Sequence, residues 1–388
     1  MNVSPKKVLV VFGTRPEAIK MAPVIQALER ADAFQAVVAV TAQHREMLDQ
    51  VLALFGIVPR YDLNIMQEGQ TLFGVTVRAL NGLERVLREV RPDVVLVHGD
   101  TTTTFTAALA AFYLKIPVGH VEAGLRTGEK YAPFPEEINR HLTAVLSDVN
   151  FAPTARARSA LLNEGVDAGG IFVTGNTVID ALFQVVRPDY RFGDGALETA
   201  VNSGRRVILV TTHRRENWGE PLAGVYRALK RVVMNHDDIT VVFPVHRNPV
   251  VSQAAAKEFA DCPRVHLTEP LPYGDFANLM SKSFLVLTDS GGLQEEAPAL
   301  GKPVLVLRDV TERPEAVDAG TVMLVGTEES RVFAAVERLL NDSTFYKRMA
   351  EAVNPYGDGR AAARIEEGLR CFFGLGPRPV EFSPPVRS

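Results

Sequence analysis

The run Thr288–Pro298, TDSGGLQEEAP, combines residue types that suit the binding of a phosphorylated nucleotide. It follows Ser283–Leu287, a short apolar run that is typical of a buried parallel strand. Gly291 and Gly292 allow a tight turn close to a ligand, and the helix predicted next would offer N–H groups to a phosphate. Glu296 lies one turn into that helix, where a carboxylate could accept from two ribose hydroxyls. An equal alternative is a turn that needs glycine for packing, with Glu296 as a solvated charge.

Two cationic residues follow the first predicted strand, Lys7–Phe12. Arg15 and Lys20 belong to the run GTRPEAIK, in which Thr14 suits a helix N-cap and the following proline and glutamate suit the first turn. The N-cap interpretation does not explain Arg15, because the helix dipole disfavours a cation at a helix start. We therefore favour contact of Arg15 and Lys20 with a bound anion over an ordinary exposed position.

Acidic residues follow two other strands. Asp100 lies in HGDTTTT after the strand Val94–His98, and Glu122 comes directly after the strand that ends at Val121. Ligands of parallel sheets bind beyond the carboxyl ends of the strands, so both carboxylates could converge on one site. Capping of the next helix is an equally good interpretation of Asp100.

Three further candidates have the right chemistry and less distinctive surroundings. Glu136 and Arg140 are spaced i, i+4, which indicates a surface ion pair unless their helix lines the site. His213 follows a strand beside two arginines, which favours acid–base work or phosphate contact over a structural role. Arg313 also follows a strand and could reach a diphosphate or a ribose.

Short apolar runs alternate with helical patterns in both halves of the chain. The predicted strands are Lys7–Phe12, Ala36–Val40, Val94–His98 and Ile116–Val121, then Val207–Val210, Thr240–Phe243, Phe284–Leu287 and Pro303–Leu307. This alternation predicts an α/β protein with parallel sheets. We expect two Rossmann-like domains that face a cleft, over residues 1–188 and 206–355, with the second binding the nucleotide. A glycine-containing stretch over 189–205 indicates a linker, and the Pro-rich tail over 374–388 is predicted to be disordered.

Composition excludes several classes of protein. The chain has 388 residues, 46% of them hydrophobic, and a net charge of -4, which argues against a general nucleic-acid binder. Cys262 and Cys371 have neither metal-site nor disulfide-framework spacing. No HExxH, Walker or Gly-x-Ser-x-Gly motif occurs. No apolar run is long enough to span a membrane and the start lacks a signal-peptide core, so we expect a cytoplasmic protein, and the absence of ligand spacings predicts no metal site.

In combination, these motifs resemble those of the bacterial non-hydrolysing UDP-N-acetylglucosamine 2-epimerases. The resemblance runs from about Lys6 to Phe373. The matching runs are FGTRPEAIK, TAQHR, VHGDTT, GHVEAGLR, PEE, HRRE, TDSGG, TERPE and NPYGDG.

The resemblance implies a GT-B-like fold, no cofactor, and interconversion of UDP-GlcNAc and UDP-ManNAc. UDP would be eliminated to give 2-acetamidoglucal and then added back, supplying surface polysaccharide synthesis. The resemblance also implies a homodimer and a C-terminal helix, within 356–373, that packs back on the first domain. Matching positions assign catalysis to Asp100, Glu122, Glu136 and His213, and UDP binding to Arg15, Lys20, Leu271, Phe276, Ser290, Gly291, Gly292, Glu296 and Arg313. At Leu271, close relatives can carry Gln.

Some relatives have a second, regulatory site for UDP-GlcNAc. Gln43, Glu136, Arg214 and His246 match positions of that site, whereas Glu46 and Gly69 replace a Gln and an Arg of clearly regulated relatives. Other hypotheses remain open: a hydrolysing epimerase that releases UDP and ManNAc, a GT-B glycosyltransferase, and, more distantly, a sugar-nucleotide sensor without turnover.

Overall fold

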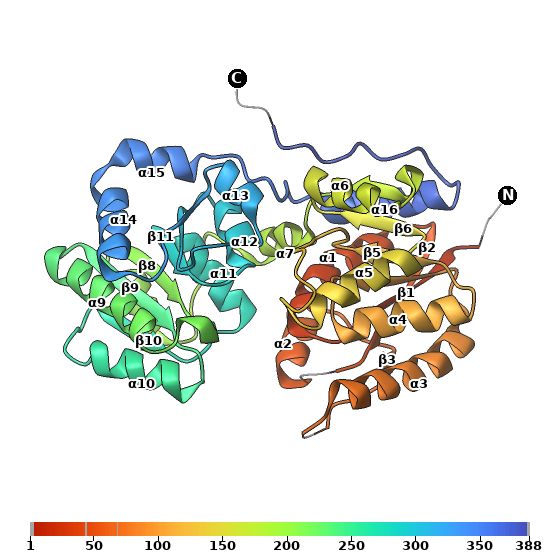
Figure 1. Cartoon of the computed structure of the whole chain (residues 1–388), viewed down its shortest axis with the longest axis horizontal. Coiled ribbons are helices and arrows are strands. Elements are labelled where there is room, and N and C mark those ends of the chain that lie inside the picture. The colour runs from red at the N-terminus through yellow and green to blue at the C-terminus, as the bar shows by residue number, and fades with distance from the viewer. Residues whose placement is uncertain (1–3, 43–44, 68, 386–388) are drawn as a thin grey trace. The chain divides into compact units, whose positions relative to one another are not determined.

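The computed structural model of the protein describes residues 4–42, 45–67 and 69–385. The chain forms two compact units, each built around its own parallel sheet. Unit 1 contains the described chain up to Phe183 and again Tyr356–Ser383, and unit 2 contains Gln184–Pro355. In each unit helices lie against the strands (Figure 1). The predicted α/β class with two Rossmann-like domains is confirmed.

The sheet of unit 1 has seven parallel strands in the order β3-β2-β1-β4-β5-β6-β7. Its central strands are apolar because helices cover both faces of the sheet, and Val8–Phe12 and Val94–Val97 have almost no exposed surface. The strands are β1 (Lys6–Phe12), β2 (Phe34–Val40), β3 (Tyr61–Asp62), β4 (Val94–His98), β5 (Val118–Val121), β6 (Val149–Ala152) and β7 (Ile171–Val173).

The helices of unit 1 pack in two groups, with α3, α4 and α5 side by side and α1 against α2 and α16. Small residues of α4, among them Ala107, Ala108 and Ala111, pack with apolar residues of β1 and β4 in one buried cluster. The helices are α1 (Arg15–Arg30), α2 (Arg45–Phe55), α3 (Leu72–Val90), α4 (Thr102–Tyr113), α5 (Glu136–Leu146), α6 (Ala155–Asn163), α7 (Thr177–Val185) and α16 (Ala361–Phe372), with a 3-10 turn η1 (Ala168–Gly170).

The sheet of unit 2 has six parallel strands in the order β10-β9-β8-β11-β12-β13. The strands are β8 (Arg206–Thr211), β9 (Ile239–Pro244), β10 (Val265–Thr268), β11 (Leu285–Thr288), β12 (Val304–Val306) and β13 (Val322–Leu324). The helices are α8 (Gly195–Val201), α9 (Glu220–Asn235), α10 (Pro249–Glu258), α11 (Tyr273–Lys282), α12 (Leu293–Ala299), α13 (Pro314–Asp318), α14 (Glu329–Asn341) and α15 (Ser343–Ala350), with a 3-10 turn η2 (Arg215–Asn217).

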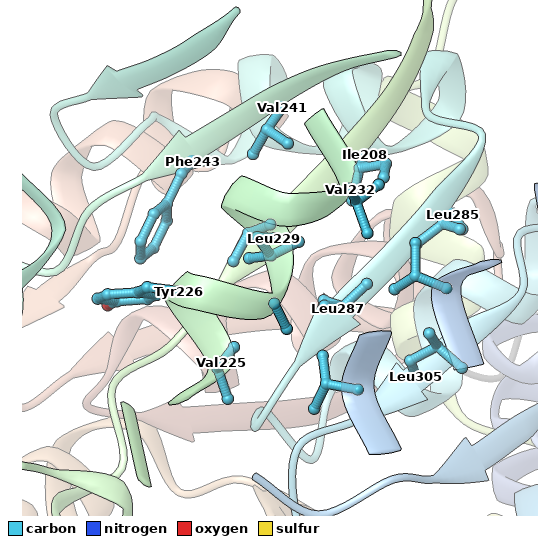
Figure 2. Packing of buried hydrophobic residues seen from close by; sticks show 14 of the residues in the cluster. Ile208, Val225, Tyr226, Leu229, Val232, Val241, Phe243, Leu285, Leu287 and Leu305 are labelled. Carbon is cyan, nitrogen blue, oxygen red and sulfur yellow. The ribbon is translucent and has the colours of Figure 1, made fainter. Parts of the chain in front are cut away.

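The apolar face of α9 builds the core of unit 2. Val225, Leu229 and Val232 recur at helical spacing and meet apolar residues of β8, β9, β11 and β12 (Figure 2). Tyr226 packs edge-on against Phe243 with ring centroids 5.6 Å apart. This packing fixes β8 and β11 beside each other, and the loops after these strands carry the candidate residues of unit 2.

Both sheets contain the strand order 3-2-1-4-5-6 of nucleotide-binding α/β folds, counted within each unit. Strand order reverses between β1 and β4 in unit 1 and between β8 and β11 in unit 2. Ligands of such sheets bind beyond the carboxyl ends of the strands at these reversal points. The loops that begin at Gly13, Gly99, Thr212 and Asp289 are therefore where a site is expected.

Two segments differ from the sequence-based expectation. The predicted linker, 189–205, belongs to unit 2 and contains α8, whose side chains Leu197 and Ala200 are buried. Of the tail predicted to be disordered, residues 374–383 belong to unit 1: Phe382 is only 6% exposed and its N–H donates to the backbone oxygen of Val173 at 2.8 Å. Neither segment has a clear helix or strand pattern in its sequence. Contacts with distant parts of the chain order both of them.

Candidate active site

The loops after β1 and β4 are joined by the carboxylate of Glu17. Its Oε2 accepts hydrogen bonds from the N–H groups of Gly13 (3.1 Å) and Thr14 (2.8 Å), and its Oε1 accepts from the hydroxyl of Thr101 (2.7 Å). Burial raises the pKa of Glu17, although the hydrogen bonds of these donors act in the opposite direction. The sequence indicates only a helix-start residue here, because Thr101 lies 84 positions further along the chain.

Glu122 lies at the centre of the unit 1 site. Its Oε2 accepts from Nζ of Lys20 at 2.5 Å and from Nδ2 of Asn176 at 2.7 Å. Its φ of 62° lies in the left-handed region, which non-glycine residues rarely adopt and which costs on the order of 1–3 kcal/mol. Backbone strain of this kind clusters at functional sites, where surrounding contacts hold it in place.

Asn176 is a site residue that the sequence-based reasoning missed. It stands between β7 and α7, and its Oδ1 also accepts from the N–H of Val178 at 3.1 Å. The run TGNT after β7 resembles the other polar strand-end runs. However, β7 has only three residues, so the strand that would have marked the position gives little signal.

Two buried histidines lie next to Glu122. Nε2 of His98 is 3.9 Å from Oε2 of Glu122, and Nε2 of His120 is 2.7 Å from the backbone oxygen of Gly99. Burial lowers the pKa of His98 to about 3 and that of His120 to about 4. Both rings are therefore neutral at pH 7, and the Glu122 carboxylate contacts the cationic side chain of Lys20.

Asp100 follows β4 and is held by α5. Its Oδ2 pairs with Nη2 of Arg140, and Nδ2 of Asn139 donates to its backbone oxygen at 2.9 Å. Burial raises the pKa of Asp100, the charge of Glu122 acts in the same direction, and Arg140 opposes both. A carboxyl group that gains a proton more readily than an exposed aspartate is suited to proton transfer.

Glu136 is the first residue of α5 and is half-buried. Burial raises its pKa, and the nearby charge of Asp100 acts in the same direction. Arg140 does not lie on the surface as the spacing indicated: it is buried, pairs with Asp100, and has Nη1 3.3 Å from Oε2 of Glu137. The structure therefore groups Asp100, Glu122 and Glu136 within one electrostatic cluster of unit 1.

In unit 2, a buried aspartate orients the candidate histidine. Nδ1 of His213 lies 2.7 Å from Oδ1 of Asp289, and the N–H groups of His213 and Arg214 both donate to Oδ2 at 2.9 Å. Burial alone would raise the pKa of Asp289, but its hydrogen bond to His213, the charge of that ring and these N–H groups bring the pKa below its usual range. With Nδ1 so engaged, Nε2 of the half-exposed ring remains for proton transfer or for contact with an anion.

The Gly291–Gly292 turn connects β11 to α12. The N–H of Ser290 donates to Oγ1 of Thr288 at 2.9 Å. One turn into α12, Glu296 is buried, and its Oε1 accepts from the hydroxyl of Tyr273 at 2.9 Å. Glu296 is therefore not the solvated charge of the alternative interpretation.

Arginines surround this turn within unit 2. Arg313, the N-cap of α13, pairs through Nε with the buried carboxylate of Glu295. Arg214 donates from Nε to the backbone oxygen of Asp289 at 2.9 Å, and its Nη2 lies 3.6 Å from Oε2 of Glu312. Arginines that are held in place by carboxylates can bind phosphate oxygens without first being ordered.

The remaining candidates have simpler surroundings. Leu271 and Phe276 are half-buried near the start of α11, and the ring centroid of exposed His246 is 6.4 Å from that of His213. Arg15 begins α1 in unit 1. Gln43 lies outside the described residues. Within the described ranges, no group of three or more His, Cys, Asp or Glu side chains could hold a metal ion, and no helix of that part of the chain is long and apolar enough to cross a membrane.

Comparison with known proteins identifies close relatives over nearly the whole chain. Residues 26–370 match the model of a family described as UDP-N-acetylglucosamine 2-epimerase. A Bacillus subtilis (strain 168) protein named UDP-N-acetylglucosamine 2-epimerase is 55% identical over 95% of this chain and 96% of its own. The crystal structure of a UDP-GlcNAc 2-epimerase from Neisseria meningitidis bound to UDP-GlcNAc is 50% identical, with a TM-score of 0.84 and coverage of 94% and 99% of the two chains. The S. aureus MnaA–UDP co-structure is 48% identical, with a TM-score of 0.88 and coverage of 97% and 100%.

Proposed function

The chain belongs to the UDP-N-acetylglucosamine 2-epimerase family, and we propose that it interconverts UDP-GlcNAc and UDP-ManNAc without net hydrolysis. In the forward direction a base removes the C2 proton, the bond between C1 and the diphosphate oxygen breaks, and a C1=C2 double bond forms. The products of this step are UDP and 2-acetamidoglucal. UDP then adds back to C1 while a proton reaches C2 from the opposite face, which inverts that carbon.

Unit 1 supplies the proton-transfer groups of this proposal. The observation that carries it is Glu122, whose backbone is left-handed and whose carboxylate is held by Lys20 and Asn176 and interacts electrostatically with Asp100. Inversion requires proton exchange on both faces of C2, so one carboxylate is not enough. We assign these transfers to Asp100, Glu122 and Glu136. Burial raises the pKa of Asp100 and that of Glu136.

Unit 2 is assigned the binding of UDP. Ser290 and the Gly291–Gly292 turn would approach the diphosphate, Arg313 would bind its oxygens, and Glu296 would accept from the ribose. His213, oriented by Asp289, would protonate or stabilise the leaving diphosphate. Leu271 and Phe276 would line the site of the base. In unit 1, Arg15 and Lys20 match anion-binding positions of the family.

Several finer parts of the proposal rest on the family resemblance. They are the use of the product in surface polysaccharide synthesis, a homodimeric enzyme, and a regulatory UDP-GlcNAc site that includes Arg214 and His246. Glu46 and Gly69 depart from the Gln and Arg of clearly regulated relatives, so activation by UDP-GlcNAc has less support than the activity itself. Kinetics at increasing UDP-GlcNAc test the regulatory site: a sigmoidal dependence would support it, and a hyperbolic one would contradict it.

Product analysis tests the main proposal. Protein treated with EDTA and given only UDP-GlcNAc should form UDP-ManNAc, as measured by NMR, until a stable mixture of the two epimers is reached. Accumulation of UDP with free ManNAc would instead establish a hydrolysing enzyme, and a requirement for a sugar acceptor would establish a glycosyltransferase. The variant Glu122→Gln should form no product, whereas Glu29→Gln, an exposed site on α1, should behave like the unaltered protein.

A further inference from the structure

We infer that residues 374–383, here called the C-terminal strap, position the carboxylate of Glu122 through Asn176. The strap follows α16 and lies beyond the residues that match the family model. Figure 1 shows it, at the blue end of the colour range, running from the end of α16 back along unit 1. The inference rests on the proposed role of Glu122 in proton transfer.

The strap is held along the outer edge of the unit 1 sheet. β7 is the last strand of that sheet, and the N–H of Phe382 donates to the backbone oxygen of Val173, its final residue, at 2.8 Å. The guanidinium of Arg378 donates to the backbone oxygens of Ile171 and Gly169, the latter at 3.0 Å. An exposed strand edge is thereby partly covered without a further strand.

Side chains fasten the strap to two helices as well. Oε2 of Glu381 lies 3.0 Å from Nη1 of Arg158 on α6. Arg364 on α16 donates from Nε to the backbone oxygen of Val380 and from Nη1 to that of Thr174, both at 3.2 Å. Arg364 therefore contacts the strap and the segment after β7 at the same time.

The segment after β7 leads to Asn176, whose side chain donates a hydrogen bond to Glu122. Gly175 has a φ of 84°, and a Cβ atom placed there would lie 3.6 Å from Cγ of Phe382, so the ring packs against this turn. The next residue, Asn176, donates its N–H to the backbone oxygen of Tyr356 at 2.6 Å and its Nδ2–H to Glu122. Only Thr174 and Gly175 separate Val173, which accepts the hydrogen bond from Phe382, from Asn176, the residue that holds Glu122.

The anchoring matters because Glu122 is strained and β7 is short. A left-handed glutamate keeps its conformation only while its surroundings hold it, and a three-residue edge strand opens locally at low cost. Removal of the strap should let the turn at Gly175 and Asn176 move. A displacement of about 1 Å at a reacting group can lower turnover by about 10²-fold.

The test uses the full enzyme with three changes: a chain ending at Leu375, the variant Phe382→Ala, and the matched control Val380→Ala, whose side chain is 84% exposed. We expect kcat to fall at least about 10-fold for the first two and to stay within about twofold for the control. The KM for UDP-GlcNAc and the Kd for UDP should change by less than about threefold, because the proposed nucleotide contacts lie mainly in unit 2. A synthetic peptide of residues 374–388 should restore part of the lost kcat in the shortened chain.

A double-mutant cycle tests whether the strap acts on Glu122 through Asn176. If the strap acts through Asn176, Phe382→Ala should have little further effect on kcat in an Asn176→Ala background. Phe382→Leu, which keeps an apolar side chain against the turn, should recover most of the activity. Independent, multiplicative losses in the double variant would overturn the proposed route.

Two further results separate the role of the strap from the proposed function. Normal kcat in both the shortened chain and Phe382→Ala, with Glu122→Gln inactive, would overturn the role of the strap and leave the proposed function standing. Activity in Glu122→Gln would overturn the assignment of Glu122 and this inference with it. If the shortened chain does not fold, Phe382→Ala, checked by its thermal unfolding midpoint, decides the question.

Discussion

Nδ1 of His213 lies 2.7 Å from Oδ1 of Asp289, a carboxylate with no exposed surface. The pair joins the loops after β8 and β11, the two strands at the reversal of strand order in unit 2. A buried carboxylate in this position selects the tautomer and the orientation of the imidazole, which leaves Nε2 for the ligand.

Asp289→Asn should therefore lower kcat by about 10²-fold or more, because the ring would lose the carboxylate that orients it. The rate of UDP-ManNAc formation measures the effect. Asp309→Asn is the control, since its side chain is 80% exposed. A near-normal rate in Asp289→Asn would show that His213 needs no carboxylate partner.

Asp100→Asn should lower turnover by about 10²-fold or more, because it removes a carboxyl group whose burial tunes it for proton transfer. Binding of UDP, measured by calorimetry, should be retained. Asp32→Asn, at an exposed site after α1, is the matched control. Retained turnover would reduce Asp100 to a residue that holds Arg140 at the end of β4.

Turnover in D2O should place deuterium at C2 of both epimers, because the C2 proton leaves to a base that exchanges with solvent. Mass spectrometry and NMR of the recovered sugar nucleotides measure the incorporation. Epimerised product that carries only protium at C2 would contradict solvent exchange and require a shielded transfer.

Arg313→Ala should weaken UDP binding by about 10-fold to 100-fold, the loss of a charge-assisted contact. It should also lower the free energy of unfolding of unit 2 by about 3 kcal/mol, because buried Glu295 loses its guanidinium partner. The control is Arg331→Ala, an exposed arginine 3.6 Å from an exposed aspartate. Lower stability with unchanged UDP affinity would assign Arg313 to Glu295 alone.

Stability should depend on pH through Asp180, whose carboxylate accepts from the N–H groups of Ala361 (3.1 Å) and Ala362 (2.9 Å) at the start of α16. Burial raises its pKa from 3.8 to about 6. A raised pKa means that the folded state binds the proton more tightly than the unfolded state. This contribution to stability is full below pH 3.8 and is lost as pH rises through about 6.

The variant Asp180→Asn cannot ionise, so it should gain stability relative to the unaltered protein by about 3 kcal/mol between pH 4 and pH 7. Urea unfolding followed across this range measures the difference, with Asp32→Asn as the control. A difference that stays constant with pH would show that Asp180 keeps an ordinary pKa.

The polar residues at the strand ends could be predicted from the sequence. Apolar runs such as Val94–His98 mark buried parallel strands, and the chemistry of parallel sheets lies just after such strands. Asp100, Glu122 and His213 were found in this way, and the structure places each of them within two residues of the end of β4, β5 or β8. Their roles remain predictions until the variants above are measured.

The partners of those residues could not be found in the same way. Asn176 follows a strand of only three residues, and the run that contains Asp289 indicates a ligand-binding turn but not the pairing of Asp289 with His213. Glu17 looks like an ordinary first-turn acid, yet it joins two loops 84 residues apart. Each of these roles depends on contacts between segments that the chain brings together only when it folds.

The sequence by itself determined the two α/β units, the strands that carry the site and the types of residue that follow them, because hydrophobic periodicity and turn residues are local properties. Tertiary structure alone decided that Arg140 pairs with Asp100, that 189–205 contains a helix and that the tail lies along β7. The physical reason is that burial and hydrogen-bond partners are set by residues far apart in the chain. The glycine-containing stretch and the Pro-rich tail become ordered because other segments of the same unit offer enough contacts to offset the conformational entropy that ordering costs.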